Sequence, residues 1–66
     1  MKIIVNGEAR DLARETCIAD LLKQLGYAQT SVAVALNQDF VSRTAYGATV
    51  IKDGDELEIV APIQGG

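Results

Sequence analysis

The 66-residue sequence predicts an α+β fold, a mixed sheet of about five strands with one main helix packed on one face. Strand-like runs lie near both ends of the chain, and one segment alone has the apolar spacing of an amphipathic helix. A helix that follows a hairpin can cross the sheet and bring the last strand beside the first. We expect a single domain over residues 1–66, with a flexible C-terminal tail over residues 61–66.

The N-terminal segment is expected to form a β-hairpin. Residues 2–5 are β-prone and meet Asn6-Gly7, the dipeptide that most strongly indicates a two-residue type I′ turn. Residues 8–12 would then be the return strand, antiparallel to the first. Because side chains alternate along a strand, Ile4 is expected to face away from the core.

The helix is expected to begin after Thr16, whose hydroxyl is a candidate N-cap, and to end at Gly26 in a left-handed conformation. Cys17 would lie in its first turn. Its apolar stripe follows the i, i+3, i+4, i+7 pattern: Ile18, Leu21, Leu22 and Leu25.

The second half of the chain is expected to supply the remaining strands. Residues 31–37 favour a central strand, residues 40–43 a short one, and residues 44–51 have no clear period. Asp53-Gly54-Asp55 indicates a tight turn before a final strand over residues 56–60. Its acidic side chains are expected to face solvent rather than to bind a cation, since the loop spacing of a calcium site is absent.

The predicted core draws on every long element of the chain. Its expected members are Ile3, Val5, Leu12, Leu21, Leu22, Leu25, Val32, Val34, Leu36, Leu57 and Ile59. Ala33, Ala35 and Ile4 would face the opposite side of the sheet, and Phe40 is a further candidate for that uncovered face. Exposed apolar surface often marks a contact site, so Ile4 and Phe40 are candidate partner-binding residues.

The composition excludes several classes of function. The absence of histidine removes Ser-His and Cys-His nucleophile pairs and the commonest zinc ligand, so we expect no catalytic residue and no metal site. A net charge of −3 argues against a nucleic-acid partner, and no apolar run indicates a membrane span or an export leader. The single cysteine, Cys17, forms no internal disulfide, which favours a reducing cytoplasm.

The sequence ends on Gly65-Gly66, a pair without β-carbons that can enter a channel too narrow for other residues. The α-carboxylate of Gly66 is ionised at neutral pH and a poor electrophile, so it becomes useful when another enzyme activates it, for example by adenylation with ATP. The alternative is a frayed end without function, as is common for termini.

The order of these elements and the Gly-Gly end resemble the ubiquitin-like β-grasp fold, and more narrowly the sulfur carrier proteins of thiamine biosynthesis. The matching pieces run from end to end, namely residues 3–8, 18–22, 25–26, 32–37, 41–43, 53–60 and 65–66. Ser42 and Tyr46 depart from the proline and tryptophan that are common in that family.

The resemblance implies a protein substrate and sulfur carrier rather than an enzyme. An E1-like adenylyltransferase would use ATP to convert the Gly66 carboxylate to an acyl-adenylate. Sulfur from a persulfide donor would then replace AMP to give a 1-thioglycine thiocarboxylate, and thiazole synthase would take this sulfur for the thiazole of thiamine. The carrier itself would bind no cofactor.

The tail is expected to reach into the partner enzymes, since residues 61–66 span roughly 20 Å when extended. Its candidate partner-binding residues are Pro62, Ile63, Gln64 and Gly65. Pro62 fixes φ and limits the entropy lost on docking, although it also simply ends the last strand. Ile63 would anchor in a partner groove or cover the edge of the domain. Arg43 would meet an acidic partner face or pair with local carboxylates.

Three other functions fit the same pattern. The small sulfur-carrier subunit of molybdopterin synthase shares the fold, the terminus and the thiocarboxylate chemistry. A ubiquitin-like modifier would join Gly66 to a lysine through an isopeptide bond. A pure interaction module would bind partners through its sheet and have an inert tail.

Overall fold

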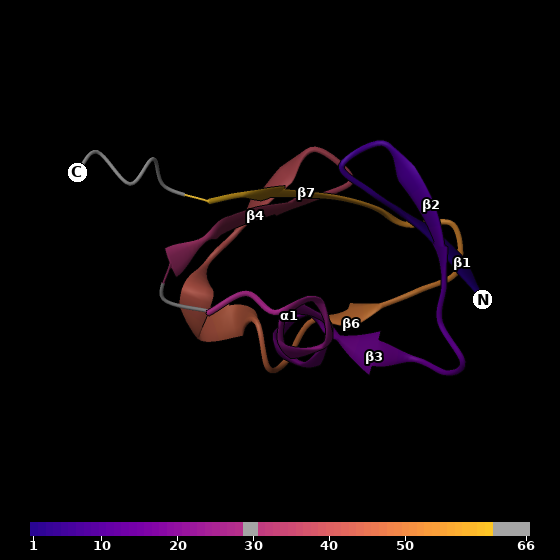
Figure 1. Ribbon diagram of the computed structural model, residues 1–66. Coiled ribbons are helices and arrows are strands. Elements are labelled where there is room, and N and C mark those ends of the chain that lie inside the picture. Colours follow the sequence, from indigo (N-terminus) through magenta and orange to yellow (C-terminus); the bar gives the residue numbers. More distant parts are fainter. Residues whose placement is uncertain (29–30, 62–66) are drawn as a thin grey trace.

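The computed structural model describes residues 1–28 and 31–61. The larger of its two layers is a five-stranded mixed sheet of order β2-β1-β7-β4-β5 (Figure 1). The strands are β1 Lys2–Val5, β2 Glu8–Asp11, β4 Ala33–Leu36, β5 Asp39–Val41 and β7 Glu56–Val60. Helix α1 (Ile18–Leu25) and a small sheet of β3 (Thr16–Cys17) and β6 (Val50–Ile51) form the other layer. The expected sheet with a helix on one face is confirmed.

The last strand lies at the centre of the sheet. β7 pairs with β1 in parallel and with β4 antiparallel, which confirms the prediction that the final strand lies beside the first. The β1–β2 hairpin turns at Asn6 (φ 51°) and Gly7 (φ 82°), both left-handed as a type I′ turn requires. Asn6 N–H donates to the carbonyl of Leu57 at 2.9 Å, so the parallel ladder continues into the turn.

The core lies between the two layers and contains most of the predicted residues. Leu57 and Ile59 point into it from β7, as predicted, whereas Leu25 and Leu36 are only partly buried. Tyr46 and Ile51 were not predicted, because residues 44–51 have no periodic pattern. The buried apolar side chains are Ile3, Val5, Leu12, Ile18, Leu21, Leu22, Val32, Val34, Tyr46, Ile51, Leu57 and Ile59.

The predicted start of the helix is wrong. Thr16 belongs to β3 and pairs with Ile51, and its hydroxyl donates to the carbonyl of Arg14 at 3.2 Å rather than to the helix. Cys17, half-buried, is the N-cap residue and makes no side-chain capping bond. The N–H of Ile18 instead donates to the carbonyl of Thr49 at 3.0 Å, so a segment distant in sequence replaces the cap.

Other boundaries differ by a few residues from the prediction. The strand expected over residues 31–37 covers Ala33–Leu36, and the strand expected over residues 40–43 covers Asp39–Val41. Arg43 lies instead in a 3-10 helix, η2 (Arg43–Ala45), which leads to the buried Tyr46.

The aspartate side chains of the turn before β7 accept hydrogen bonds from backbone N–H groups, which explains the acidic residues there. Asp53 Oδ1 accepts from Lys2 N–H at 2.7 Å, and Asp55 Oδ2 accepts from Lys52 N–H at 2.8 Å. Within residues 1–28 and 31–61, no cluster of three or more His, Cys, Asp or Glu side chains is arranged to hold a metal ion. The same residues contain no helix with the length and apolar character needed to cross a membrane.

Candidate docking face and tail root

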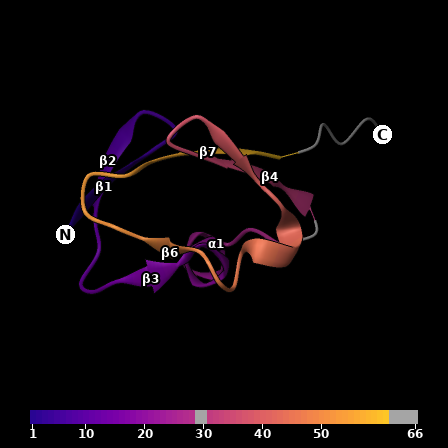
Figure 2. The same cartoon turned by 180° about the vertical axis from the view of Figure 1, so that it is seen from behind.

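The five-stranded sheet has one face against α1 and one face that no described segment covers (Figures 1 and 2). Side chains of paired residues share a face, and the register pairs Ala35 with both Phe40 and Glu58, and Ala33 with Val60. Phe40 is 74% exposed and Val60 63%. We call this surface the open face and define it by the side chains of Ile4, Ala33, Ala35, Phe40, Glu58 and Val60.

The small side chains of β4 make the open face concave. Ala33 and Ala35 lie between the larger side chains of Phe40 on β5 and Val60 on β7. They line a shallow hollow of about 150 Å³, which Glu58 also borders. The hollow is apolar with one carboxylate at its rim, a surface suited to a partner with an apolar side chain beside a basic group.

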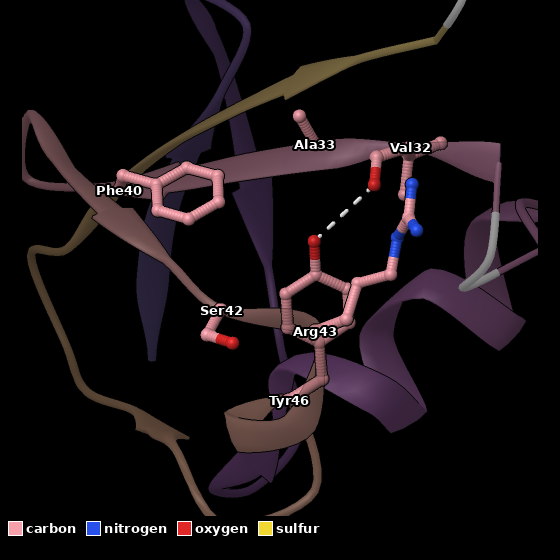
Figure 3. Close-up of a pocket in the computed structure, with 6 residues that line it drawn as sticks. All are labelled: Val32, Ala33, Phe40, Ser42, Arg43 and Tyr46. Atoms are coloured by element: carbon pink, nitrogen blue, oxygen red, sulfur yellow. Dashed lines mark hydrogen bonds between the residues drawn. The ribbon is translucent and has the colours of Figure 1, made fainter.

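A second hollow, of about 390 Å³, lies between the open face and the segment that follows β5 (Figure 3). Phe40 and Ala33 border it as well, and Arg43 supplies its cationic side chain. Tyr46 is 1% exposed and donates through its hydroxyl to the carbonyl of Val32 at 3.3 Å. Tyr46 is therefore part of the core as well as of the wall of this hollow.

The structure brings together two of the three predicted contact residues of the domain. Phe40 and Arg43 border the same hollow. Ile4 is 36% exposed and borders a separate hollow on the other side of β7, which also includes Glu58. Glu58, at the centre of the sheet, therefore links the surroundings of Ile4 to those of Phe40.

The predicted tail residues Pro62, Ile63, Gln64, Gly65 and Gly66 lie outside the described residues.

The tail begins at the open face. β7 ends at Val60, and Ala61, the next residue, is exposed. We call Val60 and Ala61 the tail root. Val60 pairs with Ala33, which borders both hollows, so the tail root lies at their rim.

Asn6 has a role next to the tail root, at Ile59, that the sequence did not reveal. Its Oδ1 accepts from Ile59 N–H at 2.8 Å, and its Nδ2 donates to the Ile59 carbonyl at 3.2 Å. The Asn6-Gly7 pattern is fully explained by turn geometry, so the sequence contained no further signal for this contact.

The sequence profile of the ThiS family matches residues 3–66 of the chain. The sulfur carrier protein ThiS of Escherichia coli is 33% identical over 66 residues, which cover the whole of both chains. Thiazole synthases of Paramagnetospirillum magneticum and Magnetococcus marinus are 41% and 44% identical over the whole of this chain. The chain spans only about a fifth of the length of these two relatives, 20% in each case.

A solved structure agrees with the sequence matches. The crystal structure of the thiamine biosynthesis protein ThiS from Geobacter metallireducens superposes with a TM-score of 0.85 at 36% identity, over the whole of both chains. This confirms the ubiquitin-like β-grasp fold. The family also confirms the expectation of a carrier rather than a catalyst for these 66 residues. The chain belongs to the ThiS family, a family of small sulfur carrier proteins of thiamine biosynthesis.

Proposed function

We propose that the chain carries sulfur as a thiocarboxylate on the α-carboxyl group of Gly66 and delivers it for thiazole formation. The observation that carries this proposal is the position of the tail root at the rim of the open face, where Val60 borders one hollow together with Phe40 and pairs with Ala33, which also borders the hollow of Arg43. A partner that docks on this face has the start of the tail at its edge. The tail is then delivered by docking rather than by a separate encounter.

The chemistry begins with activation of a stable carboxylate. A carboxylate oxygen of Gly66 attacks the α-phosphorus of ATP and expels pyrophosphate, which gives an acyl-adenylate with a good leaving group. The terminal sulfur of a persulfide donor attacks the acyl carbon and AMP leaves. A thiol reductant then cleaves the S–S bond of the acyl disulfide, which releases the thiocarboxylate and leaves a disulfide between the donor and the reductant.

The proposed function requires three partners. An E1-like adenylyltransferase that uses ATP and a persulfide sulfur donor form the thiocarboxylate, and thiazole synthase receives its sulfur. The matches to two thiazole synthases support the last of these. We place the reaction in the reducing cytoplasm, where a persulfide donor and a thiol reductant are stable.

The docking surface we propose combines apolar contact with charge. Phe40 is the anchor, because a largely exposed aromatic ring beside a hollow offers the most apolar area to a partner. Arg43 would meet an acidic group of the partner at the same hollow, and Ile4 would extend the contact across β7. In the tail, Pro62, Ile63 and Gln64 would lie in the partner's channel and contact its walls. Gly65 would let Gly66 reach the reacting atoms.

The test is the intact mass of the 66-residue protein after incubation with ATP, the E1-like enzyme, a persulfide donor and a thiol reductant. We expect an increase equal to the exchange of one oxygen for sulfur, and no increase for a variant that lacks Gly66. An unchanged mass with an enzyme that is active on its own carrier would reject the proposal. A covalent adduct with another protein that excess thiol reductant does not cleave would instead identify a modifier.

A further inference from the structure

We propose that Asn6 is a positioning residue for the modified tail. Its side chain fixes the end of β7, and thereby the point and direction in which the tail leaves the domain. This inference rests on the proposed function, because positioning matters only when Gly66 must reach a partner's active site.

The side-chain amide of Asn6 takes the place of a strand. The β1–β7 ladder pairs Val5 with Leu57, after which the backbone of β1 turns away into the hairpin. Two residues further along β7, the backbone N–H and carbonyl of Ile59 would lack a partner on this side. Asn6 Oδ1 and Nδ2 satisfy them at 2.8 and 3.2 Å. The amide group therefore imitates one more residue of a neighbouring strand.

These two bonds lie close to the tail root. Ile59 is two residues before Ala61, and on its other side β7 pairs with β4 up to Ala33 and Val60. With Asn6 in place, the end of β7 is held from both sides. Without the Asn6 bonds, only the pairing with β4 remains, and the last residues of β7 can move away from the β1–β2 hairpin. The tail would then start from a wider range of positions and enter a partner's channel less often.

Asn37 provides an internal comparison at the opposite end of the same strand. It also has φ 51° and also occupies the first position of a two-residue hairpin turn. Its Oδ1 accepts from Glu56 N–H at 3.0 Å, and its Nδ2 donates to Asp55 Oδ1 at 3.1 Å. Each asparagine therefore supports β7 with an accepted and a donated bond, but only Asn6 does so near the tail.

The experiment compares Asn6→Gly with Asn37→Gly in the full 66-residue chain. Glycine keeps the left-handed backbone at both sites, so each change removes the side-chain bonds without new strain. Formation of the Gly66 thiocarboxylate by the E1-like enzyme is followed over a range of carrier concentrations, which yields kcat and KM. Loss of folded carrier raises only the apparent KM, because unfolded molecules do not dock. Loss of positioning lowers kcat, because docked carriers present the tail wrongly.

We expect Asn6→Gly to lower kcat about 5- to 10-fold with little change in KM, and Asn37→Gly to leave kcat within about 2-fold. An unchanged kcat for Asn6→Gly, or an equal fall for both variants, would overturn the inference. If Asn6→Gly does not fold, Asn6→Asp decides, since it keeps the acceptor for Ile59 N–H and loses the donor. An unchanged kcat there would also overturn it. If the wild-type protein itself forms no thiocarboxylate, the result would reject the proposed function rather than the role of Asn6.

Discussion

The hydroxyl of Tyr46 donates a hydrogen bond of 3.3 Å to the backbone carbonyl of Val32, inside the core. Tyr46 follows η2, and Val32 immediately precedes β4. The bond therefore joins the segment that supplies Arg43 to the strand that supplies Ala33. Arg43 and Ala33 both border the larger hollow, so this one contact helps to fix the shape of the proposed docking surface.

Removing that hydroxyl should measure the contribution of the bond. Tyr46→Phe leaves the carbonyl of Val32 buried without its partner, and we expect a loss of about 1–3 kcal/mol in the free energy of unfolding. Tyr46→Ala also creates a cavity and should cost about 3–5 kcal/mol. Urea denaturation measures both values. A Tyr46→Phe protein as stable as the wild type would show that water or a shifted ring replaces the bond.

The two residues of β6 should differ strongly in how much their truncation destabilises the protein. Ile51 is 0% exposed and packs in the core, whereas its neighbour Val50 is 44% exposed. We expect Ile51→Ala to lower the free energy of unfolding by about 2–5 kcal/mol and Val50→Ala by less than about 1 kcal/mol. Thermal or urea unfolding distinguishes them. Similar losses at both positions would mean that pairing in β6, and not burial, determines its stability.

Gly26 and Gly47 form a second matched pair. A Cβ at either position would meet nothing within 4 Å, but Gly26 has φ +86° and Gly47 lies outside the left-handed region. Gly26→Ala should therefore destabilise the protein by about 1–2 kcal/mol through backbone strain alone. Gly47→Ala should be neutral or stabilising by up to about 1 kcal/mol, because it restricts the unfolded chain. Urea midpoints of the two variants test this, and equal midpoints would contradict it.

Phe40 should affect binding and not folding. It is largely exposed, so Phe40→Ala should change the free energy of unfolding by no more than about 0.5 kcal/mol. Loss of an aromatic anchor should weaken binding to the E1-like enzyme by about 10-fold, measured by calorimetry. Val50→Ala, which truncates an exposed apolar side chain away from the open face, is the control. If Phe40→Ala binds like the wild type, the docking surface lies elsewhere.

The parts of the fold that the sequence predicted depend on local patterns. The Asn6-Gly7 turn, the apolar stripe of α1 and the alternation of β7 are each set within a few residues. Thr16 was misassigned for the converse reason. Its conformation is set by pairing with Ile51, a residue in a strand too short to show a period of its own.

The candidate site also combines features that are visible in the local sequence with features that depend on contacts between distant residues. The sequence identified Phe40, Ile4 and Arg43 from their exposure and from the resemblance, but not which of them lie together. The register of β5 on β4 places Phe40 opposite Ala35 on the open face, and η2 places Arg43 at the same hollow. The second role of Asn6 required the contact with Ile59, which the turn pattern does not encode.

The central position of β7 has a consequence for the synthesis of the protein. The hairpins β1–β2 and β4–β5 can form as soon as each leaves the ribosome, but the strand that joins them is made after both. Until then each hairpin has an unpaired inner edge, which is open to aggregation. A chain that lacks β7 cannot close the sheet, so the strand that completes the fold is also the one from which the tail starts.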